Sequence, residues 1–172
     1  MLPLLLVVTL QPPAADPFAK WEKNIAAIEK RLRTEPPKPG SVFFAGSSSI
    51  VKWDLKKSFP DKEYVNVGFG GSTIPDSTHF APRIIIPYKP GTIVFYAGDN
   101  DIAQKRTPER VRDDFRAFVA AARKDNPSCL ILFIPIKPSV ARWKQFETQT
   151  KANALVREFC NGDKRLKYVD IV

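Results

Sequence analysis

The sequence predicts a three-layer α/β/α fold around a five-stranded parallel sheet, and three observations support this fold class. Five short apolar runs show no alternation of polar and apolar residues, which is typical of strands covered on both faces. Amphipathic helical stretches lie between these runs, as in a doubly wound sheet. A chain of 172 residues with 44% hydrophobic and 26% charged residues has the size and composition of a globular domain. We therefore expect a single domain over residues 16–172.

The N-terminal segment, residues 1–15, has the character of an export signal. Its first ten residues, MLPLLLVVTL, are apolar but too few to span a bilayer, which takes about 20 residues. They resemble the hydrophobic core of a secretory signal that is cleaved after Ala14 or Ala15, although the usual basic leader is missing. We expect a periplasmic or secreted protein. A loose N-terminal tail on a cytoplasmic protein is the alternative.

The remaining elements follow in order along the chain. A helix is expected over residues 17–32, where apolar residues recur at three- and four-residue steps. A second begins after Thr107, where TPERV combines a capping threonine with proline and glutamate in the first turn. A third is expected over residues 142–160, and residues 74–80 fit a short helix or an irregular segment. The five apolar runs predict strands at residues 41–46, 64–67, 92–97, 129–134 and 166–171.

Two cysteines permit at most one disulfide. Cys129 opens the fourth predicted strand and Cys160 closes the helix that follows it, so both could lie at the same end of the fold. Buried cysteine commonly behaves as a small hydrophobic residue. We expect two buried free thiols, with one disulfide as the alternative.

The formal charge of +9 raises the question of a nucleic-acid partner. The lysines and arginines are spread along the chain, without a dense basic run or a recognised nucleic-acid module. We expect a solvated basic surface, no nucleic-acid partner and no stable membrane insertion. We also expect neither metal nor cofactor, because no histidine, cysteine and carboxylate cluster has metal-site spacing and GFGGSTIP lacks the third glycine of a dinucleotide motif.

Polar and glycine-rich segments follow the first three predicted strands: GSSS at 46–49, GFGGST at 68–73 and GDND at 98–101. The carboxyl ends of parallel strands meet at one edge of the sheet, where such folds bind ligands. A serine hydroxyl at a strand-to-helix turn can act as a nucleophile. Backbone N–H groups of a glycine loop and an asparagine amide can surround an oxyanion. The combination therefore favours acyl transfer, although each segment alone could be a helix cap or a turn.

These segments resemble the blocks of the SGNH (GDSL-type) hydrolase family. FFAGSSSI is similar to the first block, with Ser47 where aspartate is commonest and Ser48 at the nucleophile position. NVGFGGST is similar to the second block, which places the oxyanion glycine at Gly71, with Gly70 as the alternative register. AGDND matches the third block and places the oxyanion asparagine at Asn100.

The resemblance implies a flavodoxin-like fold and a serine hydrolase of acyl or carbohydrate esters that uses no cofactor or metal. Ser48 is then the nucleophile, its N–H group joins Gly71 and Asn100 in the oxyanion hole, and Asp101 holds the loop. Further contacts with the substrate are expected from Ser47, Gly70, Lys137 and Arg142, with a solvated basic rim as the alternative for the last two. The last two lie in IPIKPSVARW, which resembles a sub-branch of the family.

One part of the family pattern is missing. The fourth block, Asp-x-x-His, supplies the general base after the last strand, whereas this chain ends at Val172. We expect a chain truncated before that block and therefore inactive or nearly so, because a serine hydroxyl needs an adjacent base. His79, the only histidine, is expected to be a bystander, with a role as base left open. The alternative function is a non-catalytic ligand- or carbohydrate-binding module that retains the cleft.

Overall fold

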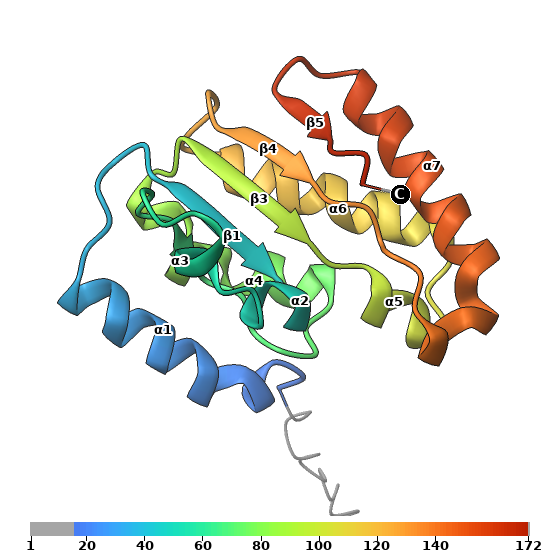
Figure 1. The fold of residues 1–172 in the computed structure, drawn as a ribbon, viewed down its shortest axis with the longest axis horizontal. Coiled ribbons are helices and arrows are strands. Elements are labelled where there is room, and N and C mark those ends of the chain that lie inside the picture. The colour runs from blue at the N-terminus through green and yellow to red at the C-terminus, as the bar shows by residue number, and fades with distance from the viewer. Residues whose placement is uncertain (1–15, 172) are drawn as a thin grey trace, which may run out of the picture.

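A five-stranded parallel sheet forms the centre of the computed structural model, which describes residues 16–171 (Figure 1). The strand order is β2-β1-β3-β4-β5, the flavodoxin-like order. The strands are β1 (Val42–Gly46), β2 (Val65–Asn66), β3 (Thr92–Tyr96), β4 (Leu130–Phe133) and β5 (Leu166–Tyr168). Each lies within its predicted apolar run, so the predicted fold class is confirmed. The expected export signal, residues 1–15, lies outside the described residues.

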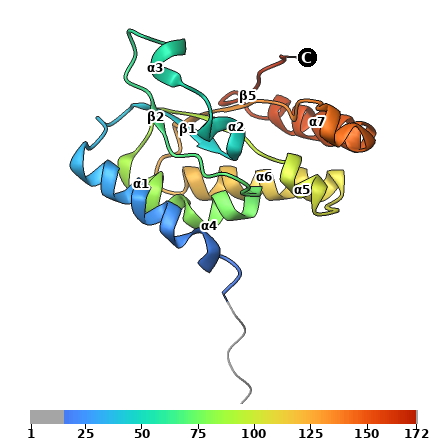
Figure 2. The same ribbon diagram turned by 60° about the horizontal axis from the view of Figure 1, so that its bottom comes forward.

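Helices lie on both faces of the sheet (Figures 1 and 2). One face carries α1 (Glu22–Thr34), α4 (Ile74–Ile84), α6 (Pro108–Arg123) and α7 (Phe146–Asn161), each packed against the next. The other face carries two short helices, α2 (Ser48–Val51) and α3 (Leu55–Ser58). The remaining short elements are η1 (Ala19–Trp21), η2 (Ile86–Tyr88), α5 (Asp99–Ala103) and η3 (Val140–Gln145).

The apolar core is divided by the sheet, because successive side chains of a strand point to opposite faces. Phe43 belongs to the larger cluster, which fills the space under α1, α4, α6 and α7 and includes Phe95 and Phe115. Its neighbour Phe44 belongs to the smaller cluster, together with Ile50 of α2 and Leu55 of α3. Both faces of β1 are therefore buried, as the absence of alternation predicted.

Local signals set the helix ends. The predicted cap of α6 is confirmed, since the Thr107 side chain accepts a hydrogen bond from the Arg110 N–H group. The stretch left open at residues 74–80 is helical, because Thr73 and Asp76 form a capping box at the start of α4. The third predicted helix begins later than expected: residues 140–145 form a 3₁₀ turn with a kink at Arg142, and α7 begins at Phe146.

Both cysteines are buried free thiols, as predicted. Burial raises the pKa of Cys129 and of Cys160 to about 11. Within residues 16–171, no helix is long and apolar enough to cross a membrane. The same residues contain no group of three histidine, cysteine or carboxylate side chains that could hold a metal ion.

Candidate active site

The strand order changes direction between β1 and β3, and in such sheets ligands bind outside the carboxyl ends of the two strands at this point. The chain leaves β1 at Ser47 and Ser48, and it leaves β3 towards Asn100 in α5. The glycine loop at residues 68–73 follows β2, on the other side of β1. The fold therefore brings the three predicted segments to one edge of the sheet.

Ser48 owes its position to a close approach between β1 and β3. Gly46 has φ of +127°, and a methyl group at this position would lie 1.9 Å from the Tyr96 carbonyl oxygen. The next N–H group, that of Ser47, donates a 2.9 Å hydrogen bond to the same carbonyl. The chain then turns into α2, whose first residue is the half-buried Ser48.

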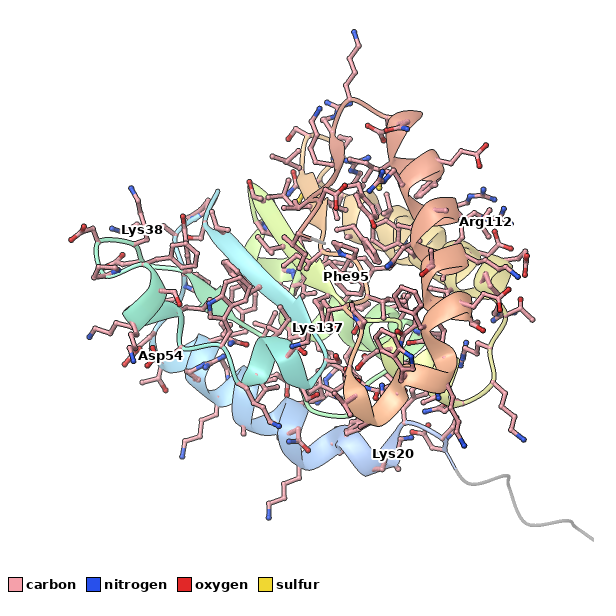
Figure 3. The ribbon with its side chains drawn as sticks, turned by 45° about the vertical axis from the view of Figure 1, so that its right-hand side comes forward. Lys20, Lys38, Asp54, Phe95, Arg112 and Lys137 are labelled. Atoms are coloured by element: carbon pink, nitrogen blue, oxygen red, sulfur yellow. The ribbon has the colours of Figure 1, made fainter. Side chains whose placement is uncertain are left out.

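A pocket of about 410 Å³ opens beside Ser48. Its walls include Trp53, Tyr96 and Lys137, and the exposed Lys137 lies near the carboxyl ends of the central strands (Figure 3). A larger pocket of about 500 Å³ lies along α7 and contains no residue predicted for the nucleophile or oxyanion hole. The smaller pocket is therefore the candidate substrate site.

The Tyr96 hydroxyl forms part of this pocket in its neutral form. It interacts with the Ser49 side chain and the Lys137 backbone. Burial, and secondarily the nearby Asp99 carboxylate, raise the pKa of Tyr96 to about 12. At neutral pH the phenol is protonated.

The glycine loop packs directly against the end of β1. A methyl group at Gly70 would lie 3.9 Å from Cβ of Ser48, so this backbone borders the predicted nucleophile. Gly71 has φ of +80°, and a methyl group there would lie 3.2 Å from the Trp21 ring. The Phe69 N–H group donates to the Gly46 carbonyl at 3.0 Å. The loop is thus fixed relative to Ser48 by main-chain contacts.

Ser72 joins this loop to both neighbouring segments. Its hydroxyl contacts the carbonyl oxygens of Phe69 at 2.8 Å and Gly46 at 3.3 Å. Its own carbonyl accepts a 2.9 Å hydrogen bond from Nδ2 of Asn100. The end of β1, the glycine loop and Asn100 are therefore connected through one buried serine.

The amide of Asn100 is held from its other side by Arg142. The Arg142 Nη2 group donates a 2.8 Å hydrogen bond to Asn100 Oδ1. Nη1 of the same guanidinium lies 2.8 Å from Oδ2 of Asp99. Both side chains of this ion pair are half-buried, with 30% of Arg142 and 19% of Asp99 exposed.

Asp101 connects α5 to the start of α4. Its fully buried carboxylate accepts hydrogen bonds from the Ile74 N–H group at 3.1 and 3.3 Å, and it lies 3.8 Å from Arg106. Burial outweighs these favourable contacts and raises the pKa of Asp101 to about 6. The carboxylate contacts the backbone at the start of α4 and does not line the pocket beside Ser48.

Two residues expected to contact the substrate, Ser47 and Arg142, are engaged elsewhere in the fold. Ser47 is fully buried, because its backbone pairs with Tyr96, and this position excludes the expected substrate contact in this conformation. Arg142 is turned towards Asn100 and Asp99 and does not line the pocket beside Ser48. His79, on α4, is exposed and stacks on Phe18 with 3.7 Å between ring centroids. Within residues 16–171 its ring makes no hydrogen bond.

Sequence reasoning missed three residues of the site: Ser72, Trp21 and Tyr96. Ser72 lies inside the predicted second block, so the sequence already indicated that it is close to the site. Trp21 belongs to the apolar stripe of the first helix, which predicted only a packing role. Tyr96 is the last residue of β3, where a hydroxyl can reach the site edge while the ring stays in the core.

The fold and the site together define a class: a flavodoxin-like α/β protein with a serine and an asparagine at the strand ends on either side of the switch point. The chain belongs to the GDSL-like lipase/acylhydrolase family, whose model matches residues 39–171. This match confirms the resemblance noted from the sequence blocks. It also shows that the chain is related to ester hydrolases.

Solved structures share the fold at low sequence identity. A protein proposed to be a platelet activating factor from Streptococcus pneumonia is 19% identical, with a TM-score of 0.76 over 86% of this chain and 73% of that chain. A GDSL-like lipase from Bacteroides thetaiotaomicron is 17% identical, with a TM-score of 0.63 over 89% and 77%. A catalytic mutant of Axe2, an acetylxylan esterase from Geobacillus stearothermophilus, is 13% identical, with a TM-score of 0.58 over 78% and 77%. No curated protein sequence matches the chain.

Proposed function

We propose that this chain carries the nucleophile and oxyanion hole of a serine ester hydrolase, with Ser48 as the nucleophile. The observation that carries the proposal is the position of Ser48, which is half-buried at the pocket wall and bordered by the glycine loop. A nucleophile must face both an acyl group and the donors that stabilise the resulting oxyanion. Membership of the acylhydrolase family supports the same reaction class.

Three N–H donors are available for the oxyanion. Within residues 16–171, the backbone N–H groups of Ser48 and Gly71 have no hydrogen-bond partner. The Asn100 amide carries two N–H bonds and gives one to the Ser72 carbonyl, so the second is free. Such donors stabilise the charge that develops on the carbonyl oxygen during attack.

The reaction follows from these parts. Ser48 Oγ attacks the ester carbonyl carbon while a general base accepts the hydroxyl proton, and the carbonyl oxygen becomes an oxyanion. The C–O bond to the alcohol then breaks, and the alcohol leaves with that proton. Water cleaves the acyl-serine by the same two steps and returns a carboxylic acid. We do not assign the base to His79, because its ring is stacked on Phe18.

We infer short acyl esters, including acetylated carbohydrates, as the substrate class. The pocket of about 410 Å³ is of a size to hold a small ester group together with part of its alcohol. It combines apolar walls, such as Trp53 and Ile134, with the exposed cation Lys137. A structural neighbour acts on acetylxylan, which makes acetylated xylan the first carbohydrate substrate to test.

The test is hydrolysis of p-nitrophenyl acetate by the product of the complete gene. Ser48→Ala should reduce kcat to the background, since removal of the nucleophile removes the covalent step. Ser139→Ala is the matched control, because Ser139 is exposed and its side chain makes no hydrogen bond within the described residues. Equal turnover by the wild type and Ser48→Ala would refute the proposal. Binding of an acetylated oligosaccharide without turnover would favour the binding-module alternative.

A further inference from the structure

Arg142 lies behind the amide that the proposed function uses as an oxyanion donor. It comes from η3, a segment 42 residues from Asn100 in sequence, and its Nη2 group donates to Asn100 Oδ1 at 2.8 Å. Its backbone N–H donates to the Ser139 carbonyl at 3.0 Å, which fixes the turn that carries it. The guanidinium therefore contacts Oδ1 of the amide, whereas Ser72 of the glycine loop contacts Nδ2.

The two contacts of the Asn100 amide specify one orientation. A guanidinium has only N–H donors, so the amide group that faces Arg142 must be the acceptor Oδ1. The Ser72 carbonyl is only an acceptor, so the group that faces it must be Nδ2. A flipped amide would place two acceptors together at Ser72 and two donors together at Arg142. The pair therefore fixes which end of the amide carries Nδ2 and its free N–H bond.

The contact also strengthens the proposed donor. A positive charge at Oδ1 draws electron density from the amide and makes its N–H bonds more polar. Hydrogen bonds that involve an ionised partner are roughly twice as strong as neutral ones. A more polar Nδ2–H bond stabilises an oxyanion better than it stabilises a neutral carbonyl oxygen, and this difference appears in kcat.

Asp99 argues against a substrate-binding role for the same guanidinium. Its carboxylate lies 2.8 Å from Nη1 and already pairs with the guanidinium, so an anionic substrate would have to compete with it. Because Arg142 contacts both Asn100 and Asp99, its guanidinium is packed against the start of α5. Lys137, in contrast, is exposed at the pocket and has no ion-pair partner within residues 16–171.

We propose that Arg142 is a positioning residue that orients and polarises Asn100 and is itself held by Asp99. The inference rests on the proposed function, because it assigns Asn100 to the oxyanion hole. The claim that Arg142 orients the Asn100 amide concerns structure alone, so it can be tested without an activity assay.

The structural test is NMR of the Asn100 side-chain amide in the 172-residue chain, assigned by the signal lost in Asn100→Ala. Arg142→Met should shift the Nδ2 proton resonances upfield, because loss of the guanidinium leaves the amide N–H bonds less polar. Lys144→Met, which removes an exposed charge from the same segment, should leave these resonances unchanged. Unchanged Nδ2 proton resonances in Arg142→Met would overturn the proposal.

The kinetic test is a double-mutant cycle on ester hydrolysis by the product of the complete gene. Arg142→Met should lower kcat by about tenfold or more, yet by less than Asn100→Ala, which should cost about 10²- to 10³-fold. KM should change by less than about twofold, because the effect is confined to the transition state. In the Asn100→Ala background, Arg142→Met should have no further effect, since it acts only through Asn100.

Three outcomes separate the alternatives. Arg142→Lys keeps the charge and one donor, so partial recovery of kcat over Arg142→Met supports positioning even if the methionine variant folds poorly. Additive losses in the cycle, or a loss confined to KM, would overturn the proposal and make Arg142 a substrate contact. Equal hydrolysis by wild type and Ser48→Ala would refute the proposed function, while the NMR result would still decide whether Arg142 holds the amide.

Discussion

Asn100 donates a 2.9 Å hydrogen bond from Nδ2 to the carbonyl oxygen of Ser72, 28 residues earlier in the chain. This bond joins the segments that follow β2 and β3. Because the Ser72 hydroxyl also reaches the Gly46 carbonyl at the end of β1, three strand ends form one connected unit. The geometry of the proposed oxyanion hole therefore depends on long-range contacts between loops that are short and well packed.

The first prediction concerns the asparagine amide. Asn100→Asp should lower kcat for p-nitrophenyl acetate at least as much as Asn100→Ala, about 10²- to 10³-fold, because it replaces an N–H donor by an anion beside the developing oxyanion. Steady-state kinetics on the product of the complete gene checks this. The control, Asn126→Ala, removes an amide at the opposite end of β3 that bonds the Pro90 carbonyl. Near-wild-type kcat in Asn100→Asp would contradict the assignment.

The second prediction distinguishes the two glycine registers. Gly71→Ala should lower kcat strongly, because φ of +80° and the Trp21 ring at 3.2 Å force its N–H group to move. Gly70→Ala should mainly raise KM, since its methyl group would make an ordinary 3.9 Å contact with Cβ of Ser48 in the cleft. Separate kcat and KM values for the two variants provide the measurement. The reverse pattern would place the oxyanion glycine at Gly70.

The third prediction concerns the junction between β1 and β3. Gly46→Ala should destabilise the protein by more than about 4 kcal/mol or prevent folding, because the new methyl group would lie 1.9 Å from the Tyr96 carbonyl oxygen at a positive φ. Gly40→Ala is the matched control, with φ of +82° but no atom within 4 Å of the added methyl group. It should cost only about 1 kcal/mol. Urea unfolding of both variants tests the difference, and similar midpoints would show that β1 and β3 separate easily.

The fourth prediction is a pH dependence of stability. The pKa of Asp101 is raised by burial from 3.8 to about 6, so the native state holds this proton more tightly than the unfolded state. The Asp101 contribution to the free energy of unfolding should therefore fall as pH rises from about 4 to about 6. Asp101→Asn keeps an acceptor for the Ile74 N–H group and removes this titration. Its stability relative to the wild type should rise over that interval, by at most on the order of 3 kcal/mol.

Urea unfolding of wild type and Asp101→Asn at several pH values measures this difference directly. Asp114→Asn is a useful comparison, since Asp114 is buried but pairs with Arg106 and Arg110. A stability difference between wild type and Asp101→Asn that is constant from pH 4 to pH 6 would contradict the prediction.

The fifth prediction concerns thiol chemistry. Burial of Cys129 and Cys160 raises the pKa of both thiols to about 11, so the reactive thiolate is scarce at neutral pH. A disulfide reagent such as DTNB should modify neither thiol in the native protein and both in denaturant. Rapid modification of the native protein would show that this end of the fold opens readily.

Much of the fold was predictable from the sequence because it depends on local pattern. Continuous apolar runs such as residues 92–97 indicate strands buried on both faces, and Phe43 and Phe44 do lie in separate core clusters. The cap at Thr107 acts within one helical turn and was recognised for the same reason. The start of α7 was misplaced by about four residues, because the apolar pattern does not reveal the kink at Arg142.

The sequence by itself determined which segments reach the site. Parallel strands place the residues that follow them at one edge of the sheet, and GSSS, GFGGST and GDND each follow a predicted strand. Only the tertiary structure decided what each side chain does there. It buried Ser47, set Trp21 beside Gly71 and turned Arg142 towards Asn100. These contacts join residues that are 42 to 50 positions apart along the chain or depend on the packing of β1 against β3. Their geometry is set by the simultaneous fit of several elements, which a local pattern of residues does not encode.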